Sequence, residues 1–267
     1  MLFDTDVVPS PHRVNDKLLL VHERLCAAYT CPIRYFHDLD PLSELISSLL
    51  SHRTKNSDSG RAFKALRATF GPDWASVRDA PTEQVQAAIM AVTWPEQKAP
   101  RIQAVLRQIG TMRGGVLSLD FLADLSPFAA RQWLEQLPGV GQKTSAAVLS
   151  FSSLRLRALP VDSHHHRVAV RLAVIPPTLA VGPSHAVIEE MLPADWSAQQ
   201  VYDHHEVMML HGQHCCYYRG PACHHCPVLD LCPVGQSHVG SAPPNPRAHP
   251  GHHVEELPQR RGDAEKS

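Results

Sequence analysis

Four cysteines in the last quarter of the chain have the spacing of a metal site. Cys216, Cys223, Cys226 and Cys232 follow the pattern C-x6-C-x2-C-x5-C, so four thiols fall within 17 residues. Thiolates bind soft metals, and a set this compact favours an iron-sulfur cluster. Zinc is the alternative, although its ribbon sites usually pair two C-x2-C units across a longer insertion.

A lysine beside a glycine turn forms a second candidate site. The segment LPGVGQKTSAAVLSF (137–151) places Gly139 and Gly141 between two apolar-patterned stretches. Glycines let the backbone approach a ligand closely, and free N–H groups at a helix N-terminus bind an anion such as a DNA phosphate. Lys143 would lie in the first turn of the second helix, where the helix dipole favours the neutral, nucleophilic amine. The alternatives are a plain glycine-capped corner and an ordinary surface or phosphate-binding lysine.

Asp162 follows Lys143 by 19 residues, at the start of the segment DSHHHRV. A nucleophilic lysine and a carboxylate suit glycosidic chemistry on a nucleotide, because one attacks C1′ while the other stabilises positive charge and moves protons. The alternative is a carboxylate that only caps the following helix. The three consecutive histidines 164–166 would face different sides of that helix, so they are not expected to bind a metal together.

Helices are expected to position these residues, because apolar side chains recur at intervals of three and four rather than two. Asp40-Pro41 and Ser126-Pro127 each supply an N-cap followed by proline at the first helical position. The second of these helices is expected to end at Pro138-Gly139. No strand pattern is convincing, and the prediction is an all-α fold.

The composition is that of a soluble globular protein. The chain has 267 residues, of which 43% are apolar and 19% charged, with a mean hydropathy of −0.19. It lacks a run of about 18 apolar residues, and Asp4 and Asp6 stand where a signal peptide would be basic and then apolar. We therefore expect a cytoplasmic protein, and a monomer by default, because nothing in the sequence indicates oligomerisation. Thiols stay reduced in that compartment, so Cys26, Cys31 and Cys215 are expected to be core or spare thiols rather than disulfide partners.

The charge is unevenly distributed along the chain. The net charge is −1, but residues 41–170 carry 15 basic and 10 acidic side chains, an excess of +5, while residues 171–236 carry 2 and 6. A local phosphate-facing patch is therefore compatible with the neutral total. From residue 237 onward the sequence offers little apolar surface to bury, which predicts a disordered tail over 237–267.

Taken together, the three motifs resemble those of the endonuclease III family of helix-hairpin-helix DNA glycosylases. The segments LPGVGQKTSAAVL, VDSHHHRV and HGQHCCYYRGPACHHCPVLDLC stand in that family's chain order, and the likeness covers roughly residues 16–235. The resemblance implies a two-domain all-α fold with DNA bound in the groove between the domains. Residues 41–155 would form a six-helix barrel domain carrying the helix-hairpin-helix motif. Residues 13–40 and 156–236 would form an iron-sulfur cluster domain from both chain ends.

The resemblance also implies base-excision repair of oxidised pyrimidines in double-stranded DNA, followed by cleavage of the abasic site. Such a protein would be associated with the bacterial nucleoid. By position, Lys143 would be the Schiff-base nucleophile and Asp162 the carboxylate that assists it. The four cysteines of the spacing pattern would hold a [4Fe-4S] cluster. The expected DNA contacts outside the wedge loops are Gly139, Val140, Gly141, Lys143, Thr144, His164 and Arg219.

Two positions depart from the family pattern. Arg53, in LLSHR, stands where the family often has a glutamine that enters the duplex. Trp94, in AVTWP, stands where a leucine wedge is common. We expect both side chains to act as wedges that fill the gap left by an extruded nucleotide. Two other functions stay open, namely a mismatch-specific glycosylase of the same superfamily and a damaged-DNA-binding protein with little or no catalysis.

Overall fold

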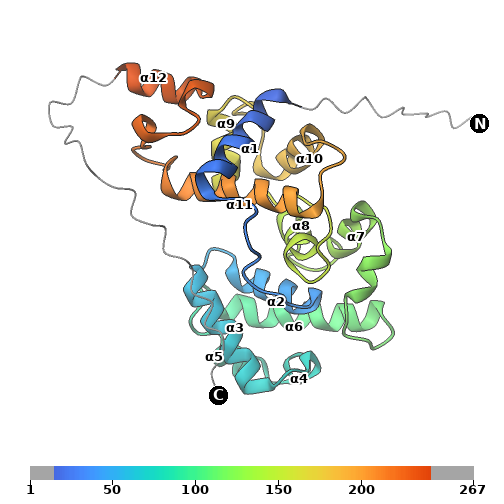
Figure 1. Cartoon of the computed structure of the whole chain (residues 1–267). Coiled ribbons are helices and arrows are strands. Elements are labelled where there is room, and N and C mark those ends of the chain that lie inside the picture. The colour runs from blue at the N-terminus through green and yellow to red at the C-terminus, as the bar shows by residue number, and fades with distance from the viewer. Residues whose placement is uncertain (1–14, 242–267) are drawn as a thin grey trace, which may run out of the picture.

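The computed structural model describes residues 15–241, which contain α-helices and short 3-10 turns but no β-strand (Figure 1). The expected all-α fold is therefore confirmed. The helices are α1 (Asp16–Tyr29), α2 (Pro41–Ser51), α3 (Asn56–Phe70), α4 (Trp74–Asp79), α5 (Thr82–Ala88), α6 (Pro95–Met112), α7 (Pro127–Leu134), α8 (Gln142–Phe151), α9 (Ser163–Arg171), α10 (Val181–Met191), α11 (Ala198–His214) and α12 (Pro233–Ser241). The 3-10 turns are η1 (Asp120–Asp124), η2 (Cys223–His225) and η3 (Leu229–Leu231). No described helix is long and apolar enough to span a bilayer.

Buried apolar side chains form two separate clusters. One extends from Leu42 on α2 to Ala158 after α8 and contains the apolar faces of α2 to α8. The other joins Leu18, Val21 and Leu25 of α1 to α9, α10, α11 and the cysteine-rich segment. Figure 1 shows α1 against α11 rather than against α2, its neighbour in sequence. We propose these clusters as the cores of the two expected domains.

Local capping explains where the helices around the site begin and end. The Asp40 carboxylate accepts hydrogen bonds from the first backbone N–H groups of α2, and the Ser126 hydroxyl caps α7, as the sequence predicts. However, α7 ends at Leu134, earlier than the expected stop at Pro138-Gly139. The chain tightens there into a turn, in which Leu137 N donates to Leu134 O at 3.0 Å.

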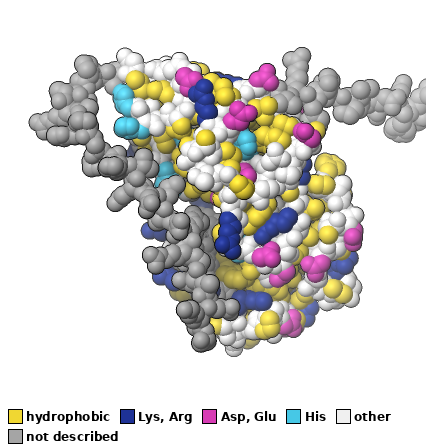
Figure 2. Space-filling view, viewed as in Figure 1, with side chains coloured by type: hydrophobic (Ala, Val, Ile, Leu, Met, Phe, Trp, Pro, Cys, Tyr) yellow, Lys and Arg dark blue, Asp and Glu magenta, His cyan; other side chains and the backbone are white. Residues whose placement is uncertain are grey.

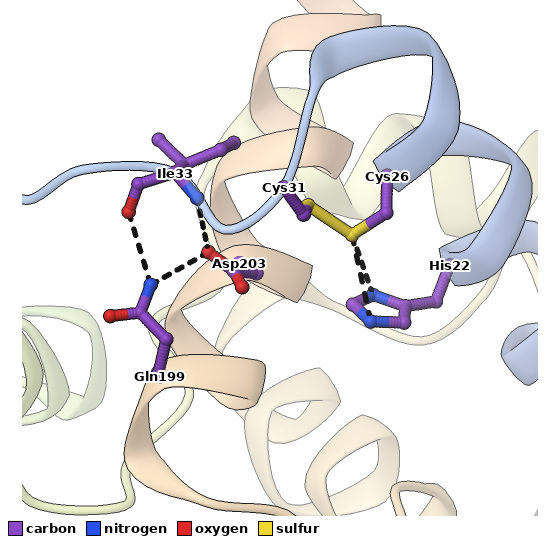
Figure 3. Close-up of a disulfide and its surroundings, with 6 residues drawn as sticks. All are labelled: His22, Cys26, Cys31, Ile33, Gln199 and Asp203. Carbon is purple, nitrogen blue, oxygen red and sulfur yellow. Dashed lines mark hydrogen bonds between the residues drawn. A yellow bond between two sulfur atoms is a disulfide. The ribbon is translucent and has the colours of Figure 1, made fainter.

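Cys26 and Cys31 form a disulfide, so the expectation that they are free thiols is wrong (Figure 3). Thr30 ends α1 in the left-handed region at φ 64°, which turns the chain back on itself. Cys31 N then donates to Cys26 O, and the two Cα atoms lie 4.9 Å apart. Reasoning from the redox compartment did not take this turn into account. Cys215 is a free, buried thiol, as expected.

The segment after the disulfide is anchored to α11 before it reaches α2. Ile33 N donates to the Asp203 carboxylate at 2.8 Å, and the Gln199 amide donates to Ile33 O at 3.0 Å (Figure 3). Asp203 is 4% exposed, and Gln199 also donates to it, so its charge is hydrogen-bonded rather than orphaned. These contacts fix the crossing of the chain from one apolar cluster to the other.

Helix α12 continues past the predicted start of the tail. The tail prediction is wrong for residues 237–241, because they extend the helix that begins at Pro233. This helix packs closely on the cysteine segment at Gly235, where a Cβ atom would lie 3.0 Å from Leu229 Cδ1 and 3.4 Å from Cys232 Sγ. Residues 242–267, the rest of the predicted tail, lie outside the described residues.

Glu44 is a buried carboxyl on α2 whose ionisation is expected to control stability. Its side chain is 3% exposed, accepts a hydrogen bond from Ser48 Oγ at 3.0 Å and lies 3.1 Å from His37 Nε2. Burial raises the pKa of Glu44 to about 8, and burial also lowers the pKa of His37. At neutral pH the contact is therefore between two uncharged groups.

We expect Glu44→Gln to stabilise the fold at pH 8 by roughly 2 to 4 kcal/mol and to change stability little at pH 5. Between the unfolded pKa near 4.5 and the folded pKa near 8, the folded state holds a proton that the unfolded state has lost, so wild-type stability falls as pH rises through this window. Glutamine resembles the protonated carboxyl without this penalty. Urea unfolding of both proteins at the two pH values measures the difference. An equal difference at both pH values would contradict the prediction.

Candidate nucleic-acid cleft and metal centre

The turn between α7 and α8 brings the backbone close to a basic side chain. Gly139 has φ +80°, and a Cβ atom there would lie 2.8 Å from Arg101 Cδ, so both conformation and space favour glycine. Val140 is buried and fixes the turn to the core. Gly141 is the N-cap residue of α8. It has no side chain, so the first N–H groups of α8 are not capped by a side chain.

Lys143 lines a cleft of about 400 Å³ that is formed by three helices. The end of α2, the beginning of α6 and the first turn of α8 contribute its walls. Four of its lining side chains are cationic, and none is a carboxylate. The lining residues are Leu49, Ser51, His52, Arg53, Trp94, Gln97, Lys98, Arg101, Ile102 and Lys143. Such a concentration of positive charge in a concave surface attracts a polyanion.

The molecule as a whole has no excess of positive charge, unlike the lining of the cleft. The net charge is −1, and Figure 2 shows Lys and Arg side chains (dark blue) interspersed with Asp and Glu side chains (magenta) over the visible face. A polyanionic ligand would therefore be attracted by the cleft and not by the net charge of the molecule.

His52 is a neutral imidazole within this cleft. Its Nε2 atom lies 3.0 Å from Thr144 Oγ1, which links the end of α2 to the first turn of α8 beside Lys143. Burial, reinforced by the charges of Lys143, Lys98 and Arg101, lowers the pKa of His52 to about 4. At physiological pH the ring can therefore accept or donate a hydrogen bond but adds no charge.

Asp162 caps α9, as the alternative interpretation of the sequence anticipates. Its Oδ1 atom accepts hydrogen bonds from the backbone N–H groups of His164 (2.9 Å) and His165 (2.8 Å). The cap does not exclude a second role, because the carboxylate still acts on its surroundings. Burial lowers the pKa of the buried His205, the Asp162 charge opposes this shift, and the Lys143 charge adds to it. Both charges thus lie within electrostatic range of one ring.

The two predicted wedge residues meet at the rim of the cleft. Arg53 follows α2 and Trp94 precedes α6, and both have a left-handed backbone, with φ of 52° and 56°. The Arg53 guanidinium carbon lies 5.8 Å from the centroid of the Trp94 ring. The Thr93 hydroxyl donates to Arg53 O at 3.0 Å, which ties the two loops together.

The remaining predicted DNA contacts lie away from the cleft lining. His164 packs against α11, where a Cβ atom on Gly212 would lie 2.8 Å from His164 Cβ, and its Nδ1 atom is 3.1 Å from Arg167 Nη2. Arg219 is exposed in the loop between the first two cysteines of the spacing pattern. Their roles as DNA contacts stay predictions.

Sequence reasoning missed His52, Lys98 and Arg101. Lys98 and Arg101 stand three residues apart, so they share one face of α6 in the two turns that follow Trp94. That spacing, next to a predicted wedge, was the available signal. No comparable signal marked His52, which was noted only as a neighbour of Arg53.

The four predicted metal ligands converge on one apolar cavity. Cys216, Cys223, Cys226 and Cys232 all line it, together with the free thiol of Cys215. Two of the sulfur atoms accept hydrogen bonds, which stabilise thiolates. Arg171 Nη1 donates to Cys216 Sγ at 3.2 Å, and Gly235 N donates to Cys232 Sγ at 3.3 Å. The donor set therefore fits a thiolate-ligated cluster.

Cys226 is the thiol most prepared for ligation. Hydrogen bonds from Cys215 and from His211, whose Nε2 atom lies 3.6 Å from Cys226 Sγ, outweigh the opposite effect of burial and lower the pKa of Cys226 to about 4. Ligand atoms of His211, Cys215 and Cys226 all lie within 4.8 Å of one another. Thiolate is the form that binds metal, so this environment favours ligation.

No protein-family model matches the chain. Endonuclease III of Bacillus subtilis is 31% identical over 200 residues, which is 74% of this chain and 83% of that protein. The chain belongs to the endonuclease III family.

Other similarities agree with this assignment to the endonuclease III family. Endonuclease III of Sulfolobus acidocaldarius is 27% identical over 191 residues, covering 70% of the chain and 79% of that protein. The chain spans 64% of the length of an Arabidopsis thaliana relative that is 29% identical over 194 residues. A solved non-covalent endonuclease III–DNA complex superposes with a TM-score of 0.71 at 22% identity, covering 84% of the chain and 98% of that structure. A thermostable thymine-DNA glycosylase gives 0.67 at 21% identity. These two structures show that the helix-hairpin-helix glycosylase fold is shared.

Proposed function

We propose that this protein is a base-excision repair DNA glycosylase that also cleaves the abasic site it produces. Oxidised pyrimidines in double-stranded DNA are the proposed substrates. The observation that carries the proposal is the position of Lys143 in the first turn of α8, in a cationic cleft whose lining contains no carboxylate. A polyanionic strand is attracted to such a cleft, and the cleft contains a primary amine that can act as a nucleophile.

The chemistry would begin with an extruded nucleotide, because C1′ is inaccessible in a stacked duplex. The neutral Lys143 Nζ attacks C1′ while the bond from C1′ to the base breaks, and the base leaves with that electron pair and takes up a proton. Loss of a proton from Nζ and opening of the sugar ring give an imine between Lys143 and C1′. The imine acidifies the C2′ proton, and its removal expels the 3′ phosphate by β-elimination.

Asp162 is the group proposed to assist these steps. A carboxylate near the reacting sugar stabilises the positive charge that develops there and can hold a proton in transit. The cap on α9 fixes Oδ1 through two hydrogen bonds of 2.8 and 2.9 Å, so the carboxylate is positioned before substrate arrives. The same side chain would thus cap α9 and assist catalysis, from a position outside the residues that line the cleft.

Cys216, Cys223, Cys226 and Cys232 are the residues that would hold a [4Fe-4S] cluster. When bound, the cluster would supply a covalent cross-link that orders residues 216–232, with no part in the bond changes described above. Arg171 would then be held by the Cys216 sulfur and by the carbonyl oxygens of Tyr217 and Tyr218, to which it donates at 2.7 and 3.0 Å. The loop carrying Arg219 is fixed by these contacts.

The proposed function is tested by borohydride trapping on a duplex with one abasic site. We expect the wild-type protein at low salt to form a covalent adduct, because borohydride reduces the imine to a stable amine. Separate duplexes with one oxidised pyrimidine test base release and the opposite-base preference. A protein that binds the abasic duplex, carries an intact cluster and gives no adduct would refute the enzymatic proposal and favour a damage-binding role.

A further inference from the structure

Arg53 and Trp94 are held in a conformation that neither residue prefers. A left-handed backbone is unfavourable for a non-glycine residue, and here two such residues face each other across the cleft rim. Trp94 is 45% exposed, so its own burial does not explain how it is held. Neighbouring contacts must therefore fix both loops.

Lys98 supplies those contacts from the first turns of α6. Its side chain is 6% exposed, and its Nζ atom donates to Leu50 O at 2.6 Å, to His52 O at 2.8 Å and to Thr54 Oγ1 at 2.8 Å. An ammonium has three N–H donors, and all three are used on the end of α2 and the turn after it. The carbonyl end of a helix dipole also favours a cation there.

The same hydrogen-bond network reaches the second loop through one hydroxyl. Thr54 Oγ1 accepts from Lys98 and also from Thr93 N at 3.1 Å. Thr93 in turn donates its hydroxyl hydrogen to Arg53 O at 3.0 Å. The residues on either side of the rim are therefore joined through Lys98, Thr54 and Thr93.

We propose that Lys98 is a positioning residue that holds Arg53 and Trp94 together as one rigid wedge for opening the DNA duplex. The inference rests on the proposed function, because a wedge matters only if a nucleotide is extruded. An abasic nucleotide lacks the base that must be unstacked, so it needs the wedge least. Loss of Lys98 therefore affects extrusion of an intact lesion far more than imine formation at a preformed abasic site.

The wedge is expected to weaken in alkaline solution. The charged or titratable groups around Lys98 are Arg101 on α6, Lys143 on α8, and His52 and Arg53 after α2, with no carboxylate in the cleft lining. Burial, reinforced by the Arg101 charge, lowers the pKa of Lys98 to about 8. As pH rises from 7 to 9 the ammonium loses one of its three donors, and extrusion slows.

The test compares wild-type holoprotein with Lys98→Met by two readouts. The first is the fluorescence of 2-aminopurine placed opposite a single oxidised pyrimidine, thymine glycol, which rises when the 2-aminopurine is unstacked. The second is borohydride trapping on a preformed abasic duplex. We expect extrusion to slow about tenfold or more in the variant, since small displacements of positioning groups have effects of that size, while adduct yield changes less than about twofold. In the wild type we expect the extrusion rate to fall between pH 7 and 9, and in Lys98→Met we expect no such fall.

Two further variants keep the comparison decisive. Thr54→Val removes the hydroxyl that joins Lys98 to Thr93 without changing the charge of the cleft. As a single substitution it should slow extrusion, and in the double variant with Lys98→Met it should cause no further slowing. If thermal unfolding and absorbance near 400 nm show that Lys98→Met does not fold, the same two readouts are made on Thr54→Val instead. Lys64→Met, an exposed lysine on α3, controls for loss of one charge.

Two results would overturn the inference. One is extrusion at the wild-type rate in both Lys98→Met and Thr54→Val. The other is an equal loss of extrusion and adduct, which would give Lys98 a direct or general structural role. Failure of the wild type to form an adduct would refute the proposed function instead, and the extrusion readout would still test the wedge.

Discussion

We expect the Lys143→Gln variant to give no borohydride-trapped adduct with an abasic duplex, a loss on the order of 10³-fold or more. Glutamine has no nucleophilic amine, so no imine can form with C1′. Its side chain is similar in length and polar, and it keeps the cleft open. Binding of the intact duplex should weaken only modestly, because three other cations line the same cleft. Denaturing gel electrophoresis after trapping measures the adduct, and fluorescence anisotropy measures binding.

The control for this prediction is Lys64→Gln, which removes a lysine from the exposed face of α3. It should give the wild-type yield of adduct. Persistence of the adduct in Lys143→Gln would mean that another amine reacts. Lys98 would then be the first residue to test, because it lines the same cleft and its pKa of about 8 leaves part of it neutral at pH 8.

A second large effect is expected at the proposed metal centre. Cys223→Ala should abolish the absorbance near 400 nm of the purified protein and lower stability by about 4 kcal/mol or more, as loss of a structural metal site typically does. Residues 216–232 have only short 3-10 turns and would lose the ligands that hold them in place. Ultraviolet–visible spectra, iron and zinc analysis, and urea unfolding measure the outcome.

Cys215→Ala is the matched control, because Cys215 is also buried and lines the same cavity but breaks the predicted spacing. It should retain the absorbance near 400 nm. Iron-free, zinc-loaded wild-type protein would contradict the cluster prediction and support the zinc alternative. Loss of the absorbance in Cys215→Ala with its retention in Cys223→Ala would mean that the ligand set was assigned wrongly.

Structural features that depend on a few adjacent residues were predicted correctly. The N-caps at Asp40 and Ser126 were found because a side-chain acceptor followed by proline determines the local backbone. The glycine turn before α8 was recognised for the same reason, and Gly139 has the positive φ for which glycine is suited. The cysteine spacing predicted thiols around one site, and the four side chains do line one cavity.

Features that depend on contacts between distant segments could not be predicted from one sequence. Lys98 and His52 lie 46 residues apart, and nothing in their local patterns indicates that the lysine binds the end of α2. The disulfide was missed for a different reason. It forms within a single turn, whereas the expected reducing cytoplasm favours free thiols. The extension of α12 was missed because its apolar residues are few, and Gly235 allows close packing that hydrophobicity does not indicate.

The pairing of α1 with α11 has a consequence for biosynthesis. The apolar face of α1, made by Leu18, Val21 and Leu25, leaves the ribosome long before α11, which ends at His214. Residues 41–158 can complete their own apolar cluster while α1 still lacks its partner. The half that carries the cysteines therefore closes late, after nearly all of the described chain has emerged. The candidate metal ligands, Cys216 to Cys232, are synthesised after α11, and a nascent chain that stalls before α11 presents an uncovered apolar helix to chaperones and proteases.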